Sequence, residues 1–204
     1  MSSTQSSAPS STFTQLVRQS RTALLALIAA TLVLGLAYPL AVFAVGRLVP
    51  ARADGQVVSA DGREVGSAVV GQAFEGEQWF VPRPSAAGDG YDPLASGASN
   101  LGPESRDLLA AVEERRAAAA AADGTAPADV APDALTASGS GLDPHVSPEY
   151  AQQQVARVAA ARGLGEQQVA DLVAEHVQGR SLGFLGEPRV NVLELNLALQ
   201  ALQP

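Results

Sequence analysis

The residues of this chain that could do chemistry gather in one short stretch, Leu135 to Pro148, which reads LTASGSGLDPHVSP. Ser138 or Ser140, with Asp143 and His145, supplies the residue types of a hydrolase triad. Three such groups so close together on one flexible loop rarely place nucleophile, base and orienting acid in line. A membrane-anchored extracytoplasmic hydrolase that uses this loop is therefore the alternative hypothesis for the function.

The same loop contains Ser138-Gly139-Ser140-Gly141, which has two further interpretations. Glycine permits alternating signs of φ, so these residues could form a nest of backbone N–H groups that binds an anion. They could instead form a tight loop whose glycines allow another surface to approach closely, with Asp143 and Ser147 capping backbone groups. We favour the docking loop, because the chain has no lysine to assist an anion.

Missing residue types exclude several kinds of chemistry. All 13 basic residues are arginine, so a Walker A loop and Schiff-base catalysis are both excluded. There is no cysteine, which removes disulfides and thiolate ligands. The two histidines, His145 and His176, lack paired metal-ligand spacing, and we expect no metal site. His176 falls on an apolar helical face and is interpreted as a satisfied residue at the edge of the core.

An uncharged segment near the N-terminus must position the rest of the chain. Residues 22–46 run for 25 residues without a charge, about 37 Å of helix, which exceeds a hydrocarbon core of about 30 Å. The segment is too long for the apolar region of a signal peptide, which is the competing interpretation. It predicts one transmembrane helix that Pro39 could kink. Residues 1–21 then form a disordered cytoplasmic tail.

Residues 47–204 form the predicted extracytoplasmic domain, and their charge limits their partners. They hold 11 arginines against all 21 acidic residues. An acidic domain repels phosphate backbones, so nucleic acid is excluded as a partner. Residues 22–46 give the chain a second kind of partner, membrane lipid.

Turn and cap residues divide this domain into short helices and short strands. We therefore predict one small α/β domain. Asp61-Gly62 between two β-branched runs predicts a hairpin. Residues 83–103 are a long loop, and residues 125–133 are an exposed linker. Caps and helical spacing predict four helices, which begin at Pro103, Ser147, Gly165 and Asn191.

Six ordered motifs carry a resemblance to a known family. They are GSAVVGQAF at 66–74, WFVPRPSA at 79–86, SGASNLGP at 96–103, the loop at 135–148, VARVAAARG at 155–163 and GRSLGFLGEPRVNVLELNLAL at 179–199. With the apolar segment they make the chain similar to the C subunit of the bacterial Kdp potassium-transporting ATPase over nearly all of residues 22–202. Trp79, Tyr150 and the length of the Ala-rich stretch 117–128 depart from the family pattern.

The resemblance implies a non-catalytic subunit of a high-affinity potassium uptake pump in the inner membrane. Its expected partners are a channel-like potassium-translocating subunit and an ATP-hydrolysing P-type subunit, whose affinity for ATP it raises as a catalytic chaperone. It binds no cofactor tightly, and ATP acts through the complex. The resemblance also implies nucleotide binding by the loop Ser138-Gly139-Ser140-Gly141. The residues expected to dock on a partner are Arg83, Pro84, Ser85, Asn100, Asp143 and His145. A free-standing solute sensor is a third possibility.

Overall fold

A computed structural model describes residues 10–202 of the chain. The chain divides into two compact units, one that ends at Asp54 and one that begins at Gly55. The first unit is helical, and the second holds every described strand and the hydrophobic core.

The first unit contains one long helix with a local irregularity. It consists of α1 (Ser10–Leu32), a π-helical turn η1 (Val33–Ala37) and α2 (Tyr38–Gly46), followed by the short α3 (Pro50–Ala53). Pro39 has no N–H to donate, and its ring would clash with a carbonyl one turn earlier. The wider turn directly before Pro39 accommodates the proline, so the helix continues.

This helix is long and apolar enough to cross a membrane, as the sequence predicts. The span covers Thr12–Gly46, its most apolar stretch of 18 residues has a mean hydropathy of 2.3, and none of that stretch is buried. It starts earlier than expected: residues 10–21, predicted to be disordered, are helical, because nothing between Ser10 and Arg21 breaks the helix. The remainder of the predicted tail, residues 1–9, lies outside the described residues.

The second unit begins with the predicted hairpin. Strands β1 (Val57–Ala60) and β2 (Arg63–Ser67) pair antiparallel. The two residues between them have positive φ, 50° at Asp61 and 76° at Gly62. These are the conformations that a two-residue hairpin turn needs, which is why Asp-Gly predicts it correctly.

Two predictions about the next segment need correction. Helix α4 (Arg106–Asp123) begins at the cap Ser105, whose hydroxyl accepts from the N–H of Leu108, and not at Pro103. Residues 125–133 are not an exposed linker. They fold into the short 3-10 turns η2 (Pro127–Asp129) and η3 (Pro132–Ala134), and Val130 and Ala131 are buried in the core. The apolar side chains of this Pro/Ala segment explain its burial.

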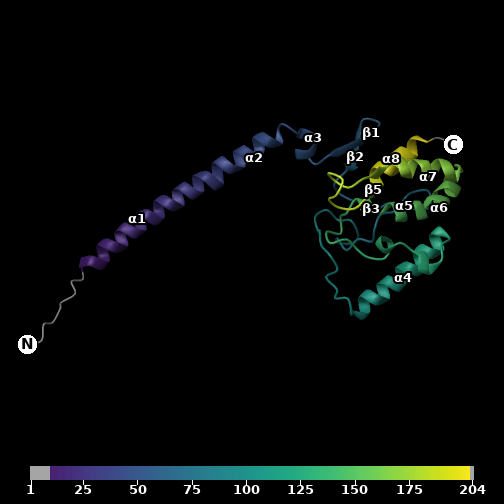
Figure 1. The fold of residues 1–204 in the computed structure, drawn as a ribbon, viewed down its shortest axis with the longest axis horizontal. Coiled ribbons are helices and arrows are strands. Elements are labelled where there is room, and N and C mark those ends of the chain that lie inside the picture. The colour runs from purple at the N-terminus through teal and green to yellow at the C-terminus, as the bar shows by residue number, and fades with distance from the viewer. Residues whose placement is uncertain (1–9, 203–204) are drawn as a thin grey trace, which may run out of the picture. The chain divides into compact units, whose positions relative to one another are not determined.

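The core lies between a small sheet and four helices (Figure 1). The sheet is antiparallel with the order β3 (His145–Val146), β5 (Arg189–Asn191) and β4 (Val177–Gln178). The helices are α5 (Pro148–Gln153), α6 (Val155–Arg162), α7 (Glu166–Glu175) and α8 (Val192–Ala201). The largest apolar side chains fully buried among them are Phe80, Val158, Val169, Val173, Val190, Val192, Leu195 and Leu199.

Two buried amides hold the extended segment that leads to the site. Asn196 accepts from the N–H of Phe80 and donates to its carbonyl, both at 2.9 Å. Gln154 does the same for Val81, at 2.7 and 3.1 Å. These amides replace the neighbouring strand that the segment lacks, so its buried backbone groups stay paired. Arg83 follows two residues later.

Candidate functional site

The two loops singled out in the sequence bind each other. Ser85 Oγ donates to the carbonyl of Gly141 at 2.6 Å and accepts from the N–H groups of Ala87 and Tyr91. On the other side, the carbonyl of Ser140 accepts from Ser96 Oγ and from the N–H of Gly97, both at 2.9 Å. The loop of residues 83–103 and the loop of residues 135–148 therefore form one surface.

Gly141 permits this close approach. Its φ is 68°, and a Cβ added there would lie 2.7 Å from the nitrogen of Ala87 and 2.7 Å from the carbonyl oxygen of Gly97. Its N–H donates to the carbonyl of Ser138, which is buried. Only glycine combines this backbone conformation with backbone atoms on both sides. At Gly141 the surface that approaches is another loop of the same chain.

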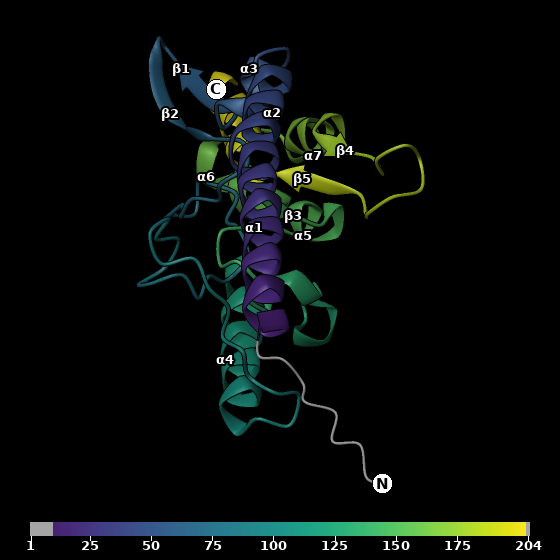
Figure 2. The same cartoon turned by 90° about the vertical axis from the view of Figure 1, so that its left-hand side faces the viewer.

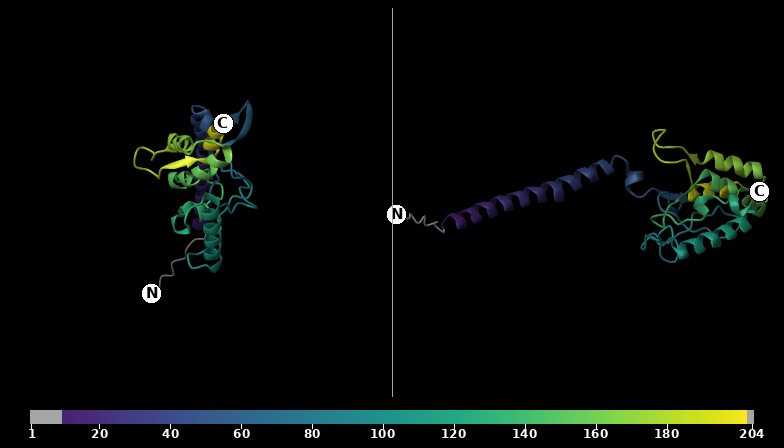
Figure 3. Two further views of the ribbon diagram at one scale, coloured as in Figure 1. Left: turned by 90° about the vertical axis from the view of Figure 1, so that its right-hand side faces the viewer. Right: turned by 60° about the horizontal axis from the view of Figure 1, so that its bottom comes forward.

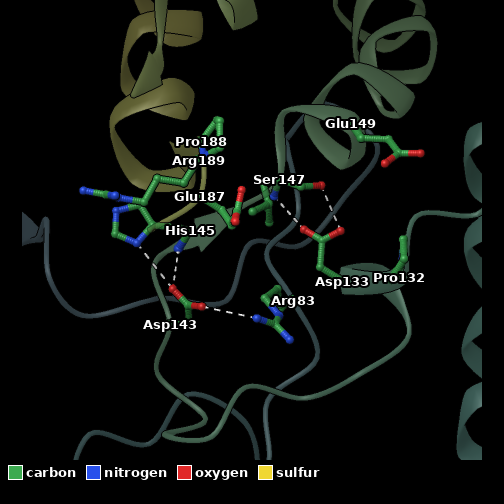
Figure 4. A pocket seen from close by; sticks show the side chains of 11 residues that line it. Arg83, Pro132, Asp133, Asp143, His145, Ser147, Glu149, Glu187, Pro188 and Arg189 are labelled. Carbon is green, nitrogen blue, oxygen red and sulfur yellow. Dashed lines mark hydrogen bonds and ion pairs between the residues drawn. The ribbon is translucent and has the colours of Figure 1, made fainter. Parts of the chain in front are cut away.

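An open pocket of about 490 Å³ lies at the end of this paired surface (Figure 4). Arg83 comes from one loop, Asp143 and His145 come from the other, and all three line the pocket. Asp143 accepts from the backbone N–H of His145 at 3.0 Å and pairs with its Nδ1 at 3.3 Å. Its second oxygen pairs with Arg83 at 3.4 Å. Three of the predicted docking residues are thus brought together.

Arg83 is held from several directions, yet it keeps an unused donor. Its guanidinium also donates to the carbonyl and the hydroxyl of Thr136 at 3.3 and 3.4 Å. Tyr91 donates its hydroxyl to the carbonyl of Arg83 at 2.7 Å, which fixes the backbone. Nε of Arg83 is buried without a hydrogen-bond partner. Such an atom costs free energy unless a further group reaches it.

The surroundings of Asp143 set its pKa. Burial alone would raise the pKa of this carboxyl, but hydrogen bonds from His145, together with the charges of His145 and Arg83, hold it below the ordinary value. Asp143 is therefore ionised at neutral pH. Its charge keeps the two loops joined at the pocket.

This ionisation makes the effect of Asp143→Asn depend on pH. Because the folded pKa is lowered, the contribution of Asp143 is present above its unfolded pKa of about 3.9 and is lost as the pH falls through the folded value. We expect the variant to lose about 1 kcal/mol of unfolding free energy above about pH 5 and progressively less below about pH 4. Urea titrations of the full chain in detergent, followed by the emission of Trp79, the only tryptophan, measure the difference. A loss that is the same at pH 7 and pH 3 would contradict this assignment.

The geometry does not form a hydrolase triad. Within residues 10–202, no hydrogen bond joins a serine hydroxyl to His145, and Ser140 Oγ accepts from the N–H of Leu142 instead. The serine that lines the pocket, Ser147, donates to Asp133 at 2.9 Å and caps α5. The aspartate and histidine have no nucleophile in line.

The sequence also contains the hydrolase pattern G-x-S-x-G at Gly179 to Gly183. In hydrolases this pattern marks a sharp turn between a strand and a helix. Here the central residue, Ser181, lies in an exposed loop between β4 and β5, and its N–H and carbonyl both pair with Leu185. The pattern is therefore not a nucleophile elbow.

The remaining predicted residues lie apart from these contacts. Pro84 follows Arg83 on the same segment, whereas Asn100 is exposed, has a φ of 51° and donates to the carbonyl of Ala98. His176 pairs its Nδ1 with the carbonyl of Leu172 at 2.8 Å, as expected of a satisfied histidine. Among residues 10–202, no group of three His, Asp or Glu side chains could hold a metal ion.

Sequence reasoning missed part of the pocket wall. The charged side chains that it did not name are Asp133, Glu149, Glu187 and Arg189. Asp133 was placed in a linker, although its carboxylate accepts from the N–H and the hydroxyl of Ser147 at 2.6 and 2.9 Å. The sequence predicts the helix cap at Ser147-Pro148, but no local pattern indicates that a residue 14 positions earlier holds that cap.

Comparison with known proteins identifies the family of this chain. Residues 20–201 match the family model described as KdpC, K+-transporting ATPase, c chain. The chain belongs to the KdpC family. A potassium-transporting ATPase KdpC subunit of Kineococcus radiotolerans is 80% identical over 94% of this chain and 97% of its own length. Those of Nitratidesulfovibrio vulgaris and Mycobacterium bovis are 55% and 50% identical over 92% and 91% of this chain, and 94% and 99% of their own lengths. The resemblance carried by the six KdpC motifs is confirmed.

Proposed function

We propose that this chain is an accessory subunit of the Kdp potassium-uptake ATPase that works through its contacts and carries out no catalysis. One observation carries the proposal: the polar side chains that could do chemistry are committed to holding the domain together. Asp143 binds Arg83 and His145, and Ser147 caps a helix. With family membership established, docking on the other subunits is the use that fits this surface best.

The helix supplies the anchor in this proposal. The helix Thr12–Gly46 is long and apolar enough to cross a membrane, so lipid and partner helices must cover it. The short N-terminal segment lies in the cytoplasm, and the acidic domain lies on the outer side of the inner membrane. The positive-inside rule alone is nearly tied here, because Arg18 and Arg21 precede the uncharged residues 22–46 and Arg47 and Arg52 follow them.

The paired loops supply the docking surface. Their partner is the channel-like potassium-translocating subunit, and Arg83, Ser85, Asp143 and His145 hold the surface in shape for it. Pro84 and the exposed Asn100 lie on the same loop. The acidic face also concentrates cations at the outer mouth of the partner.

Any effect on ATP reaches the hydrolysing P-type subunit indirectly. An outer domain cannot touch cytoplasmic ATP, so a change in nucleotide affinity passes through the span or the partner subunits as a coupling free energy. Two observations support this route over direct binding at residues 138–141. The Gly141 N–H already donates to the carbonyl of Ser138, and the next N–H, that of Leu142, donates to Ser140 Oγ.

The variant His145→Ala distinguishes docking from catalysis. We expect membranes that carry the pump with this variant to retain at least about half of the potassium-stimulated ATP hydrolysis, since only one contact of Asp143 is lost. Membranes without the chain should need a higher ATP concentration for half-maximal hydrolysis. If His145→Ala abolishes a turnover that the purified chain shows without partners, the chain is a hydrolase and the proposal fails.

A further inference from the structure

The loop between β4 and β5, residues 179–188, presents an apolar tip. Leu182 is 83% exposed, Phe184 is 68% exposed and Leu185 is 50% exposed. The loop projects from the rest of the domain in two views taken from opposite sides (Figures 2 and 3). Contiguous large apolar side chains in solvent are costly for a protein, and such patches mark interaction sites.

The tip is held in an ordered conformation. Ser181 and Leu185 exchange two backbone hydrogen bonds of 2.9 Å, and the N–H of Gly183 donates to the carbonyl of Arg180. Below them Arg180 and Glu187 form an ion pair of 2.6 Å. Leu182 has a φ of 54°, a conformation that leucine rarely adopts. The fold thus maintains backbone strain while Leu182 and Phe184 remain in water.

The base of the tip forms one wall of the pocket described above. Glu187, Pro188 and Arg189 line that pocket, with Arg189 and Glu187 beside His145 (Figure 4). The pocket lining contains four carboxylates and two guanidinium groups. Asp143 pairs with Arg83 and Glu187 pairs with Arg180, which leaves the carboxylates of Asp133 and Glu149 with the one guanidinium of Arg189. The apolar tip and the acidic pocket are therefore adjacent parts of one surface.

We infer that this tip is the apolar anchor with which the domain docks on another Kdp subunit, in an apolar socket flanked by basic side chains. The inference rests on the proposed function and names the part of the surface that provides most of the affinity. Apolar anchors buried at the centre of an interface contribute most of its affinity, and charges beside them set orientation. The acidic pocket favours basic side chains on the partner.

Two other partners for the tip are a lipid surface and a second copy of this chain, and charge argues against both. A lipid surface favours tips that carry free basic or interfacial aromatic residues, but Arg180 is already paired and the tip has no Trp or Tyr. A second copy bound through the same surface would place two acidic pockets near each other, and like charges oppose that contact. A basic partner subunit meets neither objection.

The double variant Leu182→Ser and Phe184→Ser tests the anchor in the detergent-solubilised complex. Burial of the two side chains predicts that the variant chain leaves the complex roughly 100-fold faster than the wild type. Leu109→Ser, which changes a leucine on α4 that is 55% exposed, should leave the rate unchanged. If the wild type co-purifies with its partners and the double variant dissociates at the same rate, the inference fails while the proposed function stands. If the wild type retrieves no partner, the proposed function fails first.

A single cysteine identifies the occupant, because the chain has none of its own. Full-length Phe184→Cys is labelled with an environment-sensitive fluorophore and placed in phosphatidylcholine vesicles, with and without the other subunits. We expect an emission typical of water without them and a blue shift with them. Quenching by brominated lipid without partners would assign the tip to the bilayer and overturn the inference. A blue shift that grows with the density of this chain alone would assign it to a second copy and overturn the inference as well.

Discussion

Gly141→Ala is expected to separate the two loops and to lower the unfolding free energy of the domain by about 3 kcal/mol. Two costs add: alanine at a φ of 68° is disfavoured by about 1 kcal/mol, and a Cβ at 2.7 Å from the backbone of Ala87 and Gly97 forces the loops apart. The hydrogen bond from Ser85 to Gly141 is then lost. Urea unfolding of the full chain in detergent, followed by Trp79 emission, measures the change.

The neighbouring glycine provides the matched control. Gly139 belongs to the same Gly-Ser stretch, but a Cβ added there meets no heavy atom within 4 Å. Gly139→Ala should therefore change the unfolding free energy by less than about 0.5 kcal/mol. Equal effects of the two substitutions would mean that the contact between the loops is not what Gly141 provides.

Arg157→Ala is expected to cost about 3–5 kcal/mol, because it leaves a buried carboxylate without its partner. The side chains of Arg157 and Asp123 are only 8% and 3% exposed, and Nε of Arg157 lies 2.7 Å from Asp123. The same guanidinium donates to the carbonyls of Glu77 and Trp79 and to Gln154. It therefore joins α4, α6 and the segment before Phe80.

An exposed arginine on α4 serves as the control for this substitution. Arg106 lies at the start of the helix, where a cation gains nothing from the helix dipole. Arg106→Ala should leave the unfolding free energy within about 0.5 kcal/mol of the wild type. The role assigned to Arg157 would be wrong if its loss cost less than about 1 kcal/mol in the same titration.

Features with a local physical cause could be predicted from the sequence. Asp61-Gly62 marks the hairpin because few residues tolerate its φ values. Ser147 and Asn191 mark the starts of helices because their side chains accept from free N–H groups there. Gly163 marks the end of a helix because its left-handed backbone lets free carbonyl groups be paired. The uncharged run before Gly46 predicts the apolar helix for a similarly local reason, since it depends only on composition.

Features that depend on contacts between distant residues could not be predicted in this way. Arg83 meets Asp143 across 60 positions of the chain, and Asn196 pairs with Phe80 across 116. The polar composition of the two loops indicates the docking residues, whereas the contacts between these residues depend on the fold. The burial of Val130 was missed because a Pro/Ala segment has no periodicity, although its side chains fill the core beneath α4.

Co-purification from detergent tests the central claim most directly, which is that this chain acts by binding its pump partners. The full chain, tagged at its C-terminus and expressed with the other Kdp subunits, should be recovered with the potassium-translocating and ATP-hydrolysing subunits in a fixed ratio. Removal of the chain should weaken ATP-dependent potassium uptake. Recovery of the chain alone, with uptake and ATP hydrolysis unchanged in its absence, would contradict the account.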